Sequence, residues 1–146
     1  MNKKKLLILL ITAILLVSCG GSSVDSPPLV YLVKDGELID GFQSSYCWDD
    51  GAGAALCVDT VEPYFDETTH LSTGGLIQFL LDTPLPDEVT LSLSKELFGD
   101  IIISETVAVV ENIDWSPAVD SGEYILTVHA KWTQGDVAYW FRVSLE

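Results

Sequence analysis

Positive charge is scarce in this sequence. Its 146 residues include only seven Lys or Arg against 22 Asp or Glu, which gives a formal net charge of −15. Three of the seven are the lysines at positions 3–5, and the other four are scattered: Lys34, Lys95, Lys131 and Arg142. A chain this acidic has no basic patch for nucleic acid or for an anionic lipid surface. We therefore expect no nucleic-acid partner and interpret the charge as a source of solubility, with cation binding as the alternative.

Signatures of catalysis are also missing. The sequence contains no Gly-x-Ser-x-Gly, no phosphate-binding glycine loop and no dinucleotide fingerprint. Its two histidines, His70 and His129, follow no pattern that would pair either of them with a nucleophilic cysteine. The carboxylate pairs at 66–67 and 87–88 lie near expected turns, where charged residues are common, so neither is singled out as an acid and base. The sequence predicts a protein that is not an enzyme and holds no cofactor.

A long apolar segment occurs only near the N-terminus. The lysines at 3–5 are followed by residues 6–17, which are all apolar except Thr12. This run of about a dozen residues is shorter than the roughly twenty that a membrane-spanning helix needs. A short basic segment before an apolar run of this length is typical of a secretory signal peptide.

The apolar run ends in Leu16-Val17-Ser18-Cys19, and Gly20 follows. This quartet resembles the lipobox of bacterial lipoproteins, with Leu16 three residues before the cysteine and a small residue directly before it. The resemblance implies cleavage before Cys19, a diacylglycerol on its sulfur and usually a third acyl chain on its amine. Two or more acyl chains hold a protein stably on a membrane. We expect an extracytoplasmic protein anchored to the cell membrane or outer envelope without spanning it; an ordinary signal peptide with an incidental cysteine is the alternative.

Three segments are expected along the chain. Residues 1–18 form the signal peptide, and residues 19–28 form a lipidated, flexible tether whose Gly, Ser and Pro cannot bury a core. Residues 29–146 form one domain that is long enough to bury one. Removal of residues 1–18 leaves four fixed positive charges against 22 acidic residues, a net charge of −18.

The expected domain reads as β-structure throughout, with no convincing helical period. Residues 89–94 alternate strictly between apolar and polar side chains, as a half-buried strand does. Residues 101–110 are rich in β-branched side chains and nearly uncharged, which suits a central strand. Further strands are expected at 29–33, around 38–39 and at 76–81, separated by turn residues. About seven to nine short strands predict an all-β, antiparallel sandwich.

The last two strands are predicted to form a hairpin. Every second residue from 124 to 132 and from 137 to 145 is apolar. A loop with an even number of residues places both apolar faces on the same side, whereas an odd loop does not. The expected cross-strand neighbours are Trp132 and Val137, Ala130 and Tyr139, Val128 and Phe141 on the apolar face, and His129 and Trp140, Thr127 and Arg142 on the outward face.

The pentapeptide Asp120-Ser121-Gly122-Glu123-Tyr124 introduces this hairpin. It resembles the Asp-x-Gly-x-Tyr of immunoglobulin-type domains, and the resemblance implies that the tyrosine hydroxyl closes a corner by bonding to backbone upstream. Where that family places a cysteine two residues after the tyrosine, this chain has a leucine. The inter-sheet disulfide of antibody domains is therefore not expected, but an immunoglobulin-like sandwich is.

Two cysteines, Cys47 and Cys57, flank a loop that contains Gly51 and Gly53. Outside the cytoplasm a disulfide is their expected state, and closing a loop of about ten residues stabilises a fold by roughly 3 kcal/mol. A catalytic thiol would lack a base, and zinc would lack further ligands. We predict no metal site, although calcium remains an alternative with three oxygen donors: Asp49, Asp50 and Asp59.

The outward face of the hairpin is the first candidate binding surface. Trp140, Arg142 and His129, with Thr127, offer ring stacking and hydrogen bonds to a glycan or peptide. The alternative is that another element, such as residues 115–117, covers Trp140. The corresponding function is a membrane-anchored binding or structural module with a protein or glycan ligand.

The loop over residues 48–56, closed by the expected disulfide, is the second candidate binding surface. An exposed Trp48 would make this loop a rigid probe of a protein partner, whereas a buried Trp48 would belong to the core. The corresponding function is an inhibitor or accessory subunit. The burial of Trp48 therefore discriminates between the two hypotheses.

Overall fold

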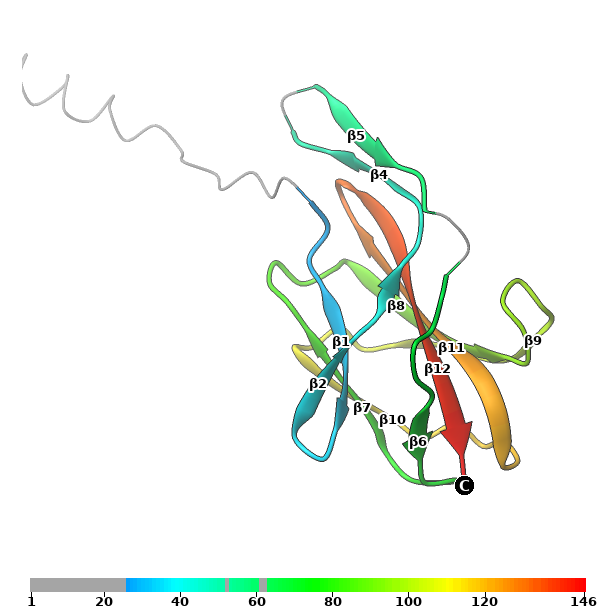
Figure 1. Cartoon of the computed structure of the whole chain (residues 1–146). Coiled ribbons are helices and arrows are strands. Elements are labelled where there is room, and N and C mark those ends of the chain that lie inside the picture. The colour runs from blue at the N-terminus through cyan, green and yellow to red at the C-terminus, as the bar shows by residue number, and fades with distance from the viewer. Residues whose placement is uncertain (1–25, 52, 61–62) are drawn as a thin grey trace, which may run out of the picture.

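The computed structural model describes residues 26–51, 53–60 and 63–146. Its strands are β1 (Val30–Lys34), β2 (Glu37–Asp40), β3 (Phe42–Gln43), β4 (Tyr46–Asp49), β5 (Ala55–Val58), β6 (Thr69–Leu71), β7 (Ile77–Leu81), β8 (Glu88–Ser94), β9 (Ile101–Val107), β10 (Asn112–Trp115), β11 (Gly122–Trp132) and β12 (Gly135–Leu145). One sheet has the strand order β10-β7-β1-β2, and a six-stranded sheet has the order β3-β12-β11-β8-β9 with β6 beside β12 (Figure 1). Strands β4 and β5 form a separate hairpin.

The core lies where the two larger sheets face each other. Side chains from both sheets join one buried cluster. On β8, for example, Val89, Leu91 and Leu93 are fully buried, whereas Thr90 and Ser92 on the other face are only half-buried. The predicted all-β sandwich is confirmed, and all strand pairs except β6 with β12 are antiparallel. The described part contains more strands than predicted because β3, β6 and β10 are too short for an alternation to be recognised.

The C-terminal hairpin has the predicted faces but not the predicted pairs. Its loop is even, with two residues, because Trp132 pairs directly with Gly135. Gly135 and Asp136 belong to β12 rather than to the turn, so every pair is displaced by two residues from the expectation. On the outward face Thr127, not His129, is opposite Trp140.

Strand β9 lies at the edge of its sheet, so the prediction of a central strand was wrong. It pairs with β8 alone, and Ile101 and Ile102 are 64% and 48% exposed. The strand ends at Val107 rather than at residue 110. A β-branched, uncharged run indicates a strand, but it does not say whether a neighbour covers both edges.

Tyr124 closes the corner that its pentapeptide predicted. Its hydroxyl donates to the backbone carbonyl oxygen of Asp120 at 2.7 Å, and its ring is buried. The ammonium of Lys95 lies 3.5 Å from the ring centroid, within the range of a cation–π contact. These contacts fix the start of β11 against the segment that precedes it.

Contacts with the sandwich begin upstream of the expected domain boundary. Pro27 and Pro28 are buried, and the carbonyl oxygen of Pro28 accepts a hydrogen bond from the hydroxyl of Tyr139. Burial raises the pKa of Tyr139 to about 12, because a charged phenolate would lose its hydration there. The predicted signal peptide, Cys19 and most of the predicted tether lie outside the described residues. Within the described part, no helix has the length and apolarity needed to cross a membrane.

Candidate functional site

Cys47 and Cys57 form a disulfide, as the sequence predicted. They lie directly opposite each other in the β4–β5 register, and both are exposed. The loop between the strands turns through Gly51 and Gly53, whose φ angles of 75° and 92° lie in the left-handed region that favours glycine. Because both sulfurs are bonded to each other, neither cysteine offers a thiolate to a substrate or to zinc.

The acidic residues of this loop bond to its own backbone. Asp49 Oδ1 accepts from the amide of Gly51 at 2.8 Å, and Asp50 Oδ1 accepts from the amide of Ala54 at 3.3 Å. Asp59 lies beyond the end of β5. In the described ranges, no three side chains of metal-binding type converge on one point. The carboxylates of Asp49 and Asp50 thus stabilise the turn.

Trp48 is a core residue, so its candidate role in binding was wrong. Only 1% of its surface is exposed, and its ring packs edge-on against that of Trp132 with centroids 5.4 Å apart. Strand β4 lies so close to the turn between β11 and β12 that a Cβ on Gly135 would collide with the carbonyl oxygen of Cys47. Side chains alternate along β4: Trp48 points inward, whereas Cys47 and Asp49 on either side of it face the solvent.

The rest of the disulfide-bonded arm, β4 and β5, projects from the sandwich (Figure 1). All residues of β5 are exposed, including Leu56 at 52% and Val58 at 36%. The arm therefore presents a small apolar surface even though Trp48 is withdrawn from it.

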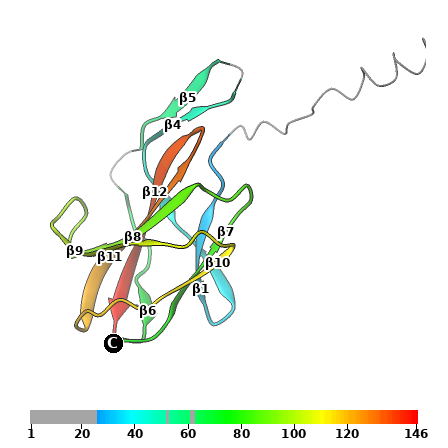
Figure 2. The same cartoon turned by 180° about the vertical axis from the view of Figure 1, so that it is seen from behind.

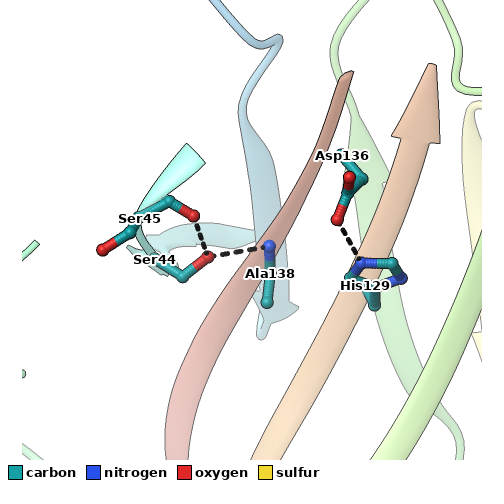
Figure 3. Close-up of polar contacts among 5 residues, drawn as sticks. All are labelled: Ser44, Ser45, His129, Asp136 and Ala138. Atoms are coloured by element: carbon teal, nitrogen blue, oxygen red, sulfur yellow. Dashed lines mark hydrogen bonds and ion pairs between the residues drawn. The ribbon is translucent and has the colours of Figure 1, made fainter. Parts of the chain in front are cut away.

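His129 does not join Trp140 in the predicted cluster. It lies opposite Ala138, and its Nε2 pairs with Asp136 Oδ2 at 2.9 Å (Figure 3). The expected register placed it two residues further along β12. His70, the other histidine, pairs through Nδ1 with Glu146 Oε1 at 2.7 Å, and this contact lowers the pKa of Glu146.

Ser44 lies near His129 and Asp136 but does not form a catalytic arrangement with them. It follows β3 on one side of β12, whereas His129 belongs to β11 on the other (Figure 3). Its hydroxyl donates to the carbonyl oxygen of Ser45 at 3.2 Å and accepts from the amide of Ala138 at 3.0 Å. These bonds attach the β3–β4 connection to β12, and none of them leads to the imidazole.

Arg142 is occupied by an ion pair. It lies opposite Ile125, and its guanidinium donates to Glu123 Oε2 at 3.1 Å. Both partners are exposed, so the pair is accessible to a competing ligand and contributes little to stability.

Trp140 belongs to a group of aromatic residues that the sequence did not predict. Its ring is nearly parallel to that of Phe42, at 10° and 6.3 Å between centroids, and the ring of Phe98 meets it edge-on at 5.5 Å. Phe65 in turn packs against Phe42 at 6.2 Å. We call Phe42, Phe65, Phe98 and Trp140 the outer aromatic cluster. Of the segment expected to cover Trp140, Trp115 is buried in the core instead, and the rings that pack against Trp140 are those of Phe42 and Phe98.

Phe98 is the most exposed member of this cluster. Its side chain is 84% exposed, and its φ of 61° is left-handed, which a non-glycine residue rarely adopts. The loop that carries it is held by bonds from Ser94 Oγ and from the amide of Gly99 to the carbonyl oxygen of Glu96, at 2.7 and 3.0 Å. Sequence reasoning missed Phe98 because it stands alone among turn residues, outside any alternating pattern.

A cleft of about 510 Å³ borders the cluster beside β2 and β12. Phe42, Phe65 and Arg142 line it together with residues of both charge signs, including Lys34 and Asp40. A ligand of the outer aromatic cluster could extend into this cleft and reach the guanidinium of Arg142.

Compared with known protein families, curated proteins and solved structures, the chain matches none.

Proposed function

We propose that the protein is a lipid-anchored, extracytoplasmic module with an immunoglobulin-like sandwich, and that it binds a protein partner without catalysing a reaction. The anchor is supported by the basic and apolar N-terminal segment and by the quartet Leu16-Val17-Ser18-Cys19. The disulfide between Cys47 and Cys57 is compatible with an oxidising compartment.

The exposure of the Phe98 ring is the observation that supports binding most strongly. Because the ring of Phe98 is 84% exposed, its burial contributes almost nothing to the stability of the free protein. The left-handed backbone of Phe98 costs conformational energy. A partner that covered this ring would bury its apolar surface and gain about 1.5–3 kcal/mol. Aromatic anchors of this kind dominate many protein interfaces.

The arrangement of rings favours a protein over a glycan. A sugar stacks on an open aromatic face, but the ring of Trp140 is met by Phe98 and lies alongside Phe42. The ring of Phe98 is a single exposed side chain rather than part of an open stacking surface. A pocket on a protein surface can enclose such a ring, and Arg142 offers a charged contact at the edge of that interface.

The disulfide-bonded arm supports a second candidate, an inhibitor or accessory subunit that engages its partner through the arm. The favouring observation is the exposed apolar surface of β5, which includes Leu56 at 52%. Trp48 has no part in this candidate because it is buried.

Site-specific photo-crosslinking in intact cells tests the proposal. A photoreactive phenylalanine would replace Phe98, Leu56 or, as a control in the other sheet, Leu38, which is 52% exposed. We expect one discrete protein adduct from position 98 and none from position 38. An adduct from position 56 alone would favour the arm. No adduct from position 98, or the same products from positions 98 and 38, would contradict the proposed surface.

A further inference from the structure

Strand β9 forms an open edge of the six-stranded sheet. It pairs with β8 on one side, and within the described residues no backbone hydrogen bond is seen on its other side. Figure 2 shows β9 and the loop before it at the margin of the molecule, away from β1 and β7. The strand contains neither Lys nor Pro, two residues that commonly protect an edge from pairing, and the register irregularity in its pairing with β8 is confined to the Ile101–Ile103 end. Its exposed Ile101 and Ile102 leave an apolar border there.

Charge distinguishes this edge from the others. The edge strand β2 carries Glu37 and Asp40 among four residues, and β10 carries Asp114 among four. Strand β9 has one charged residue in seven, Glu105, and its Oε2 accepts a hydrogen bond from Trp115 Nε1 at 2.9 Å. In the described part, β9 is the longest edge strand. Two copies of this acidic chain could pair along it without placing rows of carboxylates opposite each other.

The sequence of β9 is also complementary to itself. In an antiparallel pair of β9 strands with a two-fold axis at Ser104, Ile103 is opposite Glu105 and Ile102 is opposite Thr106 of the second copy. Ile101 is opposite Val107, beyond the irregularity that places Ile101 and Ile103 against the neighbouring residues Ser94 and Leu93 of β8. β-Branched side chains pack well across such pairs. We propose that β9 is a homodimerisation edge, at which two copies of the chain join their six-stranded sheets into one continuous sheet.

The dimer is expected to be weak and to strengthen with salt. Pairing through a single strand buries less than the roughly 1,600 Å² of a standard interface, and two mature chains of net charge −18 repel each other. Salt screens this repulsion, and anchoring in one membrane raises the effective concentration of the copies. The pairing of β9 concerns its backbone edge and not the ring of Phe98, so it does not depend on the proposed binding surface; only the charge of −18 and the effect of the membrane rest on the proposed cleavage and lipid anchor.

Engineered disulfides test the register in the full-length protein in detergent. Ser104→Cys should give a covalent dimer under mild oxidation, because the two-fold axis places residue 104 opposite itself. Thr106→Cys alone should not, but a mixture of Thr106→Cys and Ile102→Cys chains should cross-link. The unchanged chain measures the background from its own cysteines. No dimer from Ser104→Cys, or equal yields from Ser104→Cys and Thr106→Cys alone, would overturn the proposal.

A matched pair of lysine substitutions tests the edge itself. Added to Ser104→Cys, Ile102→Lys should slow cross-linking at least about tenfold. Leu38→Lys adds the same charge at a similarly exposed position on β2, 52% against 48%, and should leave the rate unchanged. Near-ultraviolet circular dichroism of the buried Trp48–Trp132 pair checks that each variant is folded. Equal rates for the two lysine variants, or cross-linking that falls with added salt, would contradict the dimer; if Ile102→Lys fails to fold, the cysteine register decides alone.

Discussion

Trp48 of β4 packs edge-on against Trp132 of β11, with ring centroids 5.4 Å apart. This contact fastens the disulfide-bonded arm to the sandwich, and the amide of Asp49 adds a bond to the carbonyl oxygen of Gln134 at 2.9 Å. The disulfide therefore holds the arm together, while the tryptophan pair fixes its position.

Replacing Trp48 should detach the arm and destabilise the fold. Trp48→Ala removes one of the largest fully buried side chains, and we expect the free energy of unfolding to fall by about 3–5 kcal/mol. Leu56→Ala on the same arm is the control, because its side chain is 52% exposed and should change stability by no more than about 0.5 kcal/mol. Urea unfolding monitored by fluorescence measures both, and equal effects would contradict the assigned burial of Trp48.

Neighbouring residues of β12 should respond in opposite ways to truncation. Phe141 is buried at 3% exposure, so Phe141→Ala should cost about 3–5 kcal/mol. Arg142 faces outward and holds only an exposed ion pair with Glu123, so Arg142→Ala should cost about 1 kcal/mol or less. Denaturant melts of the two variants decide, and an Arg142→Ala protein as unstable as Phe141→Ala would show that the strand faces are wrong.

Tyr139 should make stability decrease at alkaline pH. Burial raises its pKa in the folded state to about 12, whereas an unfolded chain releases the proton near pH 10. The folded state therefore binds the proton more tightly, so its stabilising effect is present below about pH 10 and is lost as the pH rises to about 12. The loss should reach roughly 2–3 kcal/mol.

Tyr139→Phe is the control for this titration. It removes the phenol together with its hydrogen bond to Pro28, so the variant should be less stable at neutral pH but should lose less stability between pH 10 and 12. Urea melts at several pH values compare the two proteins. Parallel pH profiles would show that Tyr139 does not titrate as its burial implies.

The sequence predicted the faces of the C-terminal hairpin because the residues that share a face of a long strand follow from its own alternation, whatever the length of the turn. It did not predict the pairs, because Gly135 and Asp136 look like turn residues but continue β12. The disulfide was predicted from two cysteines, the expected compartment and the strand-like segments on either side of the glycine-containing loop; the register that brings Cys47 directly opposite Cys57 was not predicted.

The outer aromatic cluster could not be predicted, because three of its four members come from loops or from a very short strand. Phe42 lies in a two-residue strand, and Phe65 and Phe98 lie in loops, so no periodic pattern links them to Trp140. The edge position of β9 was missed for a related reason: strand composition reports the local conformation, whereas the neighbours of a strand depend on the whole topology.

Acylation of Cys19 tests the central claim of a lipid-anchored module most directly. Cells that express the full chain would be fed an alkyne-tagged fatty acid, and the purified protein would be examined for the tag and by mass spectrometry of its N-terminal peptide. We expect a tagged protein that begins at Cys19 in the membrane fraction, and no tag after Cys19→Ala. An untagged native chain, or a tag that persists in the Cys19→Ala protein, would contradict the account.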